Sequence, residues 1–317
     1  MSSPPAGLHP FFHGLSEENQ ALLARVTQRL QVPAGQFLFR QGDPADTALF
    51  IECGRIELDV RLPGGGHLAL PASGAGSVLG ELALVERHRR SATARVVEAM
   101  QALEMHRDDL RALCAVRHPA SLSMLRRLAR LVAARLCEVN AKRVPQRSAD
   151  TRVVCRAAWQ PGAPFDLRRF LPVLPLFANF SPAEIEAVLG AADVWTIGAA
   201  QPIALYDDPP GGCFVVVRGA VEAVAPTPHG ARRLAVFGPG APVGILSALL
   251  ARPRSATWVA RERATVLELP AQALAALRDP GQRASFRFYE AVLRALIHRL
   301  EQATRALTGE RRLQPVL

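Results

Sequence analysis

The sequence Arg90-Ser91-Ala92-Thr93 returns 164 residues later as Arg254-Ser255-Ala256-Thr257. Ten positions upstream of each arginine stands a second matching stretch, Gly80-Glu81-Leu82 in the first copy and Gly244-Ile245-Leu246 in the second. The spacing is the same in both copies, but the acidic residue of the first copy is an isoleucine in the second. This duplication predicts two pockets of common ancestry, of which only the first keeps its carboxylate.

The repeat extends beyond these stretches. Ser16 and Ser181 are predicted N-caps of an opening helix in each copy, and Pro182 suits a first helical position. In the first copy, apolar residues between positions 22 and 30 recur at helical spacing, so we expect the helix to continue through Leu30. Short strands separated by glycine-rich turns follow in each copy. In the first copy they are expected at residues 37–39, 48–51, 56–60 and 67–70, and in the second at 194–197, 202–206, 214–217, 221–224 and 233–237.

Helices are expected to close each copy. In the first, residues 108–116 form a short helix and residues 121–142 a long one with apolar residues three and four apart. In the second, Phe286, Leu293, Leu300 and Leu307 recur every seven residues, which is the pattern of a coiled-coil seam. A homodimer through residues 286–307 and packing of this stripe within its own domain are both consistent with the pattern.

Composition limits the class of protein. The 317 residues are enough for about two domains, and 49% of them are hydrophobic. No apolar run is long enough to span a bilayer, and residues 1–12 lack the pattern of a signal peptide. The five scattered cysteines favour a reducing cytoplasm and show no zinc spacing. The net charge of +10 comes almost entirely from arginine. Arginines dispersed over the surface explain this charge more simply than a nucleic-acid interface does.

The first copy contains the groups that a sugar phosphate requires. A short helix starting near Glu81 would present free amide groups to an anion, and the Arg90 guanidinium suits a monoanionic phosphate. Glu81 beside that anion is favourable only if it accepts a hydrogen bond from a hydroxyl of the same ligand, and Ser91 can donate to the phosphate or a base edge. A surface ion pair between Glu81 and Arg90 without a ligand is the alternative.

These stretches resemble the phosphate-binding cassette of cyclic-nucleotide-binding domains, the module of the catabolite activator protein, the regulatory subunits of cyclic-AMP-dependent protein kinase and gated channels. The resemblance covers about residues 8–142 and 173–309. It implies a mainly β fold with flanking α-helices, in which two jelly-roll β-barrels each have an N-terminal helix, a cassette and C-terminal helices. It also implies that Glu81 holds the ribose 2′-hydroxyl, that Arg90 holds the cyclic phosphate, and that Leu82 and Ala83 supply amides.

The second copy departs from the family pattern. Arg254 keeps the phosphate role that the resemblance implies, and Gly244, Leu246 and Ser255 remain in place. Ile245 cannot accept a hydrogen bond from a hydroxyl, so we expect the second pocket to be weak, altered in specificity or purely structural. In some relatives a polar residue of the long helix contacts the base, and in the first copy Leu136 and Cys137 fall in that region.

We therefore predict a first cyclic-nucleotide-binding domain at residues 1–142, a proline-rich linker at 143–172 and a second domain with a degenerate cassette at 173–317. The expected ligand is cyclic AMP or cyclic GMP, with no metal, and the expected partner is an effector protein to which a helix rearrangement transmits binding. Neither a catalytic set nor a DNA-reading helix-turn-helix stands out, so we expect neither an enzyme nor a sequence-specific DNA-binding protein. A basic nucleic-acid-associated protein and a scaffold with vestigial pockets are the alternatives.

Overall fold

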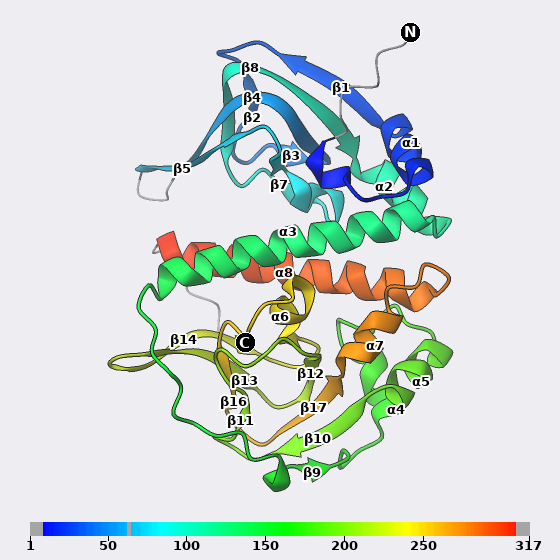
Figure 1. Ribbon diagram of the computed structural model, residues 1–317, viewed down its shortest axis with the longest axis vertical. Helices are drawn as coiled ribbons and strands as arrows, with labels where there is room; N and C mark the ends of the chain where they lie inside the picture. Colours follow the sequence, from blue (N-terminus) through cyan, green and yellow to red (C-terminus); the bar gives the residue numbers. More distant parts are fainter. Residues whose placement is uncertain (1–8, 62–64, 309–317) are drawn as a thin grey trace. The chain divides into compact units, whose positions relative to one another are not determined.

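The repeat in the sequence becomes two mainly β units in the computed structural model, which describes residues 9–61 and 65–308 (Figure 1). Contacts between backbone positions divide the chain between Arg127 and Leu128. Residues 1–8, 62–64 and 309–317 lie outside the described residues. The predicted fold class, mainly β with flanking helices, is confirmed.

The first unit has a six-stranded sheet in which β1, β8, β4 and β5 lie in that order, with β2 on β8 and β6 on β4. A two-stranded sheet pairs β3 with β7. The elements of this unit, in chain order, are η1 (Pro10–Phe12), α1 (Glu17–Arg25), β1 (Thr27–Val32), β2 (Phe37–Phe39), β3 (Pro44–Ala45), β4 (Thr47–Arg61), β5 (His67–Gly74), β6 (Val78–Leu79), η2 (Glu81–Leu84), β7 (His88–Arg89), β8 (Thr93–His106), α2 (Arg107–Ala115) and the start of α3 (Pro119–Arg143).

The second unit has a five-stranded sheet, β15-β12-β17-β10-β9, and a four-stranded sheet, β11-β16-β13-β14. After α3 its elements are η3 (Arg156–Ala158), β9 (Gln160–Pro161), α4 (Leu167–Phe170), η4 (Leu171–Val173), α5 (Pro182–Gly190), β10 (Asp193–Ile197), β11 (Pro202–Ala204), β12 (Cys213–Arg218), β13 (Val221–Thr227), β14 (Gly230–Phe237), β15 (Pro242–Val243), α6 (Ile245–Leu250), β16 (Thr257–Ala260), β17 (Ala264–Leu269), α7 (Ala271–Ala276) and α8 (Arg283–Thr308).

The two opening helices begin where their caps predict. The Ser16 side chain accepts a hydrogen bond from the amide of Asn19, and Ser181 forms a reciprocal capping box with Glu184 at the start of α5. The expectation that the first helix continues through Leu30 is wrong, because α1 ends at Arg25 and Leu30 lies on β1. The ladder of β1 against β8 supplies the backbone hydrogen bonds that a longer helix would have made locally.

The two strands expected at 48–51 and 56–60 are one continuous strand, β4, which passes through Gly54. Gly54 has φ +95°, and a Cβ atom there would lie 2.5 Å from Cβ of Met100 on β8. Gly219, 165 positions later, has φ +82°, and a Cβ atom there would lie 2.9 Å from Cα of Ala264 on β17. Glycine is required at both positions by a left-handed backbone pressed against the neighbouring strand, and the turn expected at Gly54 is instead an irregularity in pairing.

Each unit has its own hydrophobic core. In the first, a cluster of buried residues that includes Leu49, Ile51 and Val96 lies inside the roll. In the second, the corresponding cluster includes Val216, Trp258 and Val266.

The segment 143–172, predicted as a linker, contributes to that second core and contains regular structure. Val144 and Trp159 are 3% and 4% exposed within the cluster, and β9 pairs with β10. The boundaries of the linker, residues 143 and 172, stay a prediction.

The apolar stripe of α8, whose residues recur about every seven positions, is mostly buried within the single chain. Phe286, Tyr289 and Leu293 are at most 5% exposed, whereas Leu307 is 42% exposed. Packing within the chain, the alternative that the pattern left open, accounts for the buried residues. The homodimer stays a prediction, and this packing leaves little of the stripe available for a second copy.

Candidate ligand sites in the two cassettes

The backbone scaffold of the cassette arginine is the same in both units. The amide of Arg90 donates to the carbonyl of Asp43 at 2.8 Å, and the amide of Gly42 donates to the carbonyl of Arg90 at 2.9 Å. In the second unit, Arg254 forms the same two bonds with Asp208 and Asp207, at 2.8 and 2.9 Å. The duplicated sequence therefore positions both arginines through main-chain pairing that does not depend on a ligand.

A left-handed glycine begins each cassette. Gly80 has φ +73° and Gly244 has φ +81°. A Cβ atom at Gly80 would lie 2.2 Å from Nη1 of Arg90, and one at Gly244 would lie 2.6 Å from Nη1 of Arg254. Each arginine therefore packs directly against the glycine that the sequence places ten positions upstream, which explains why the two copies share this spacing.

The Arg90 side chain is held by one residue that the sequence analysis did not single out. Its Nη1 and Nη2 atoms donate to the carbonyl and to the hydroxyl of Thr47, both at 2.9 Å. Its guanidinium carbon lies 4.3 Å from the ring centroid of Phe39. The Nε–H group is buried and has no hydrogen-bond partner. A buried donor without a partner is unfavourable by about 1–3 kcal/mol, and an anionic group within hydrogen-bond reach of this Nε–H would remove that cost.

Glu81 lies in the same environment, as predicted from the sequence. Its side chain is 3% exposed and Arg90 is 9% exposed. Burial lowers the pKa of Arg90, and the negative charges of Asp46, Glu104, Asp43 and Glu81 oppose that shift. The structure thus places the acid and the guanidinium together in the interior and not in an exposed ion pair.

The remaining predicted residues of the first cassette have different environments. Leu82 and Ala83 lie on η2, a single 3₁₀ turn, and the amide of Ala83 donates to the carbonyl of Gly80 at 3.0 Å. Ser91 is exposed, directly after the buried Arg90. The short helix expected near Glu81 is this four-residue 3₁₀ turn, which begins at Glu81.

The side chain of Arg254, in the second cassette, donates hydrogen bonds to backbone carbonyls. Its Nη1 donates to the carbonyl of Gly244 at 2.9 Å, and its Nη2 donates to the carbonyl of Gly212 at 2.8 Å. Gly212 stands where the first unit has Thr47, so a hydroxyl partner is replaced by hydrogen. Burial lowers the pKa of Arg254, which is opposed by the Cys213 thiol, Asp208 and Glu268. Ile245 is 4% exposed at the position that matches Glu81.

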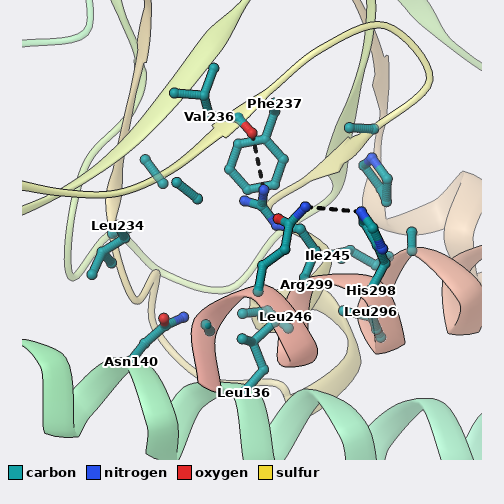
Figure 2. Close-up of a pocket in the computed structure, with 18 of the residues that line it drawn as sticks. Leu136, Asn140, Leu234, Val236, Phe237, Ile245, Leu246, Leu296, His298 and Arg299 are labelled. Atoms are coloured by element: carbon teal, nitrogen blue, oxygen red, sulfur yellow. Dashed lines mark hydrogen bonds between the residues drawn. The ribbon is translucent and has the colours of Figure 1, made fainter. Parts of the chain in front are cut away.

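A cavity of about 390 Å³ lies beside this second cassette (Figure 2). Gly244, Leu246 and Ser255, all predicted site residues, line it together with Ile245. Arg254, the fourth predicted residue, is not among the residues that line it. The walls also include residues that the sequence analysis did not assign to a site, which are Asn140 and Arg143 of α3, Phe237 of β14, and His298, Arg299 and Gln302 of α8. Leu136, considered for base contact in the first copy, lines this cavity of the second unit.

The segment after α3 is attached to the second cassette. Nη1 of Arg147 donates to the carbonyl of Ser255 at 3.2 Å, and the Thr257 hydroxyl donates to the carboxylate of Asp150. Hydrogen bonds from Thr257 and Arg152 lower the pKa of Asp150, although burial, the largest single influence, acts in the opposite direction. Sequence separation of more than 100 residues concealed these contacts.

Residues 9–61 and 65–308 show neither a metal site nor a membrane span. No group of three or more His, Cys, Asp and Glu side chains in that part of the chain could hold a metal ion. None of its helices is both long and apolar enough to cross a bilayer.

Two β units, each with an arginine packed on a left-handed glycine beside a short cassette, define a class of ligand-binding regulatory domain. The family model for the cyclic nucleotide-binding domain matches residues 29–117 and 195–279. Together these matches cover more than half of the chain, and the chain belongs to the cyclic nucleotide-binding domain family. The resemblance predicted from the cassettes is confirmed.

Curated relatives match a limited part of the chain. A cyclic AMP receptor protein of Thermus thermophilus is 33% identical over 123 residues, which are 38% of this chain and 57% of that protein. A CRP-like cAMP-activated global transcriptional regulator of Mycobacterium tuberculosis is 31% identical over 119 residues, which are 38% of this chain and 53% of that protein. The matched region thus spans a little over half the length of these relatives.

Solved structures are similar at low scores. The regulatory domain of Toxoplasma gondii PKA with cAMP is 18% identical, covering 84% of this chain and 86% of that one, with a TM-score of 0.31. A cyclic nucleotide-binding domain from Methylobacillus flagellatus is 27% identical, covering 44% of this chain and 79% of that one, with a TM-score of 0.39. The family assignment rests on the family model.

Proposed function

We propose that the chain is a cyclic-nucleotide receptor that binds cyclic AMP or cyclic GMP in its first unit. The observation that carries this proposal is the buried Arg90 guanidinium, whose Nε–H has no partner, beside the buried Glu81. In this binding mode Arg90 donates to the cyclic phosphate and Glu81 accepts from the ribose 2′-hydroxyl. Gly80, Leu82, Ala83 and Ser91 surround the phosphate.

The two binding groups have different tasks. Arg90 supplies the charge that a monoanionic phosphate requires, and Thr47 keeps the guanidinium oriented before the ligand arrives. Glu81 adds selectivity for a ribose, because an anion that lacks a hydroxyl would face an uncompensated carboxylate. Cyclic AMP and cyclic GMP share the phosphate and the ribose, so both satisfy these two residues.

We further propose that α3 transmits binding to an effector protein. The first part of α3 is attached to the first unit through Arg127, whose guanidinium donates to the carbonyls of Phe11 and His13 at 2.8 and 2.6 Å. Its last turns contribute Asn140 and Arg143 to the cavity of the second unit. A ligand shifts such an element only by binding its two states with different affinity.

The proposal includes four further features of the chain. They are the domain boundaries at 1–142, 143–172 and 173–317, a non-catalytic role, a cytoplasmic location and the absence of a metal cofactor. The second-cassette residues Gly244, Leu246, Arg254 and Ser255 are proposed as ligand-binding or structural counterparts of the first cassette.

The decisive experiment is calorimetric titration of cyclic AMP and cyclic GMP into the full chain and into Arg90→Ala. We expect one nucleotide to bind the wild type and its affinity to fall about a hundredfold in the variant, because loss of a charge-assisted contact is worth roughly 1.5–3 kcal/mol. Arg87→Ala is the matched control, since Arg87 is exposed on the same loop.

Two outcomes would contradict the proposal. Absence of binding by either nucleotide would favour a scaffold with vestigial pockets. Salt-dependent retention of the full chain on DNA, with no response to nucleotide, would favour a basic nucleic-acid-associated protein. Comparing Glu81→Gln with the wild type on cyclic AMP and on a 2′-deoxy analogue tests the hydroxyl contact separately.

A further inference from the structure

The cavity of the second unit has the walls of a site for an apolar ligand. Its volume of about 390 Å³ falls in the usual range for small-molecule sites, about 300–1,000 Å³. Apolar side chains from several elements form most of its surface, including Leu234, Phe237, Ile245, Leu246, Trp258 and Leu296. The residues that line it include neither aspartate nor glutamate. It therefore lacks the acidic group that a ribose requires.

Two arginines contribute positive charge to this cavity. Nη1 of Arg299 donates to the carbonyl of Val236 at 3.0 Å, and its guanidinium carbon lies 3.7 Å from the ring centroid of Phe237 (Figure 2). Nη1 of Arg143 donates to the carbonyl of Leu234 at 2.9 Å. Within the described residues neither guanidinium has a carboxylate partner, so two cations share one largely apolar space.

The electrostatics of this pair are unfavourable without an anion. Burial lowers the pKa of Arg299 to about 10, and the nearby charge of Arg143 contributes to that shift. Burial also lowers the pKa of Arg143, and Arg232 adds to that effect. Partly buried charges normally have a counter-ion or a network of hydrogen bonds. A carboxylate placed between the two guanidiniums would supply the missing counter-charge and accept hydrogen bonds from both.

The cassette arginine does not supply this charge. Both terminal nitrogens of Arg254 are engaged by the carbonyls of Gly244 and Gly212, and Arg254 is not among the residues that line the cavity. The positive groups that line the second cavity therefore come from α3 and α8 and not from the cassette. A ligand oriented by Arg143 and Arg299 would place its apolar body against Ile245 and Leu246.

We propose that the second cavity binds an organic anion with one carboxylate and an apolar body without sugar hydroxyls. Arg299 and Arg143 hold the carboxylate, and Phe237, Ile245 and Trp258 contact the apolar body. Ile245 excludes a ribose, because a hydroxyl buried against it would lose its hydrogen bond to water without gaining another. This site goes beyond the proposed cyclic-nucleotide function and rests on residues of the second unit alone.

The test uses decanoate as the probe and decan-1-ol as its neutral counterpart, titrated into the full chain. Tryptophan fluorescence reports binding, because Trp258 lines the cavity, with Trp258→Phe showing how much of the signal comes from it, and calorimetry gives the stoichiometry. We expect one decanoate per chain and an affinity for decan-1-ol at least about tenfold weaker, because the charged contact is lost. Equal binding of the alcohol, or no binding of decanoate, would overturn the proposal.

Substitutions test which arginines bind the carboxylate of decanoate. Arg299→Met keeps an unbranched apolar stem but removes the guanidinium, and should weaken decanoate binding by about tenfold or more. Arg294→Met is the matched control, because Arg294 lies on the same helix but pairs with Glu290 and is 40% exposed. It should bind decanoate like the wild type. A thermal melt followed by circular dichroism shows whether each variant folds, and Arg143→Met replaces Arg299→Met if the latter does not.

Unchanged decanoate affinity in both Arg299→Met and Arg143→Met would overturn the assignment. So would displacement of decanoate by cyclic AMP in the Arg90→Ala variant, because that result would place a nucleotide in the second cavity. Failure of the first unit to bind any nucleotide leaves this experiment unaffected, since its readout is decanoate alone.

Discussion

Arg90 and Arg254 have the same pair of backbone hydrogen bonds, yet different groups surround their guanidiniums. Arg90 donates to the carbonyl and the hydroxyl of Thr47, and four acidic residues including Glu81 oppose the lowering of its pKa. Arg254 donates to two carbonyls, two acidic residues oppose the lowering of its pKa, and Ile245 stands at the position that matches Glu81. The main-chain frame is the same in both copies, whereas the side chains near the two guanidiniums differ. The shared fold therefore does not by itself predict that both units bind the same ligand.

The second difference concerns the source of positive charge. In the site proposed for the first unit the cassette arginine supplies it, while in the second unit Arg143 of α3 and Arg299 of α8 line the cavity. These helices lie outside the duplicated cassette stretch, so the cassette comparison alone does not detect them. Three experiments sharpen this contrast between the units.

The largest expected effect comes from Gly80→Ala. The added methyl group would overlap Nη1 of Arg90 and lie 2.9 Å from the carbonyl of Thr47, so the guanidinium must leave its position. We expect cyclic-nucleotide affinity to fall by at least about tenfold, with about 1–2 kcal/mol lost from the free energy of unfolding through left-handed strain. Titration calorimetry and urea unfolding measure the two effects.

Gly35→Ala is the control for that experiment. Gly35 also has a positive φ, +92°, but no atom of the described residues lies within 4 Å of the place that its added methyl group would occupy. It should lose similar stability through strain and keep its nucleotide affinity. Equal loss of affinity in both variants would show that strain, and not displacement of Arg90, is the cause.

Ile245→Glu gives the second cavity the acid that the first cassette has. The new carboxylate would compete with a bound carboxylate for the positive charge of Arg143 and Arg299, so we expect decanoate affinity to fall by about tenfold. Ile245→Gln separates polarity from charge, and we expect a smaller loss there. Should the two variants bind decanoate equally, the charge of the cavity is not what selects the ligand.

The smallest effect is a pH dependence confined to the first unit. His9 is 1% exposed among Phe12 and Phe50, and burial lowers its pKa below 6.5. The unfolded chain then binds a proton more readily than the folded one as the pH falls below 6.5, so the free energy of unfolding decreases until the folded-state pKa is passed. Leu174 occupies the matching position of the second unit, 165 residues later.

His9→Leu should therefore flatten the stability profile of the chain as the pH falls below about 6.5, which urea unfolding at several pH values measures. His13→Leu is the control, because His13 is exposed on the same segment. A profile that keeps its slope in His9→Leu would assign the pH dependence to other groups.

Local sequence signals predicted much of the architecture. Ser16 and Ser181 begin their helices, and the two cassettes occur where the repeat places them, because capping and left-handed glycines act over a few residues. The predictions failed where distant pairing competes with local preference. Leu30 has helical spacing but joins β1, and Gly54 resembles a turn but lies inside β4.

The amino-acid sequence alone determined the repeat, the family and the presence of both Glu81 and Arg90 in the first cassette, because these depend on identities at fixed spacing. Only the tertiary structure showed that Thr47 orients Arg90 and that Arg254 is bound by carbonyls instead of facing the cavity. It also brought Arg143 and Arg299 to the same apolar space, although 156 positions separate them in the chain. Hydrogen bonds and charges act through distance in space, which spacing along the chain does not encode for residues so far apart.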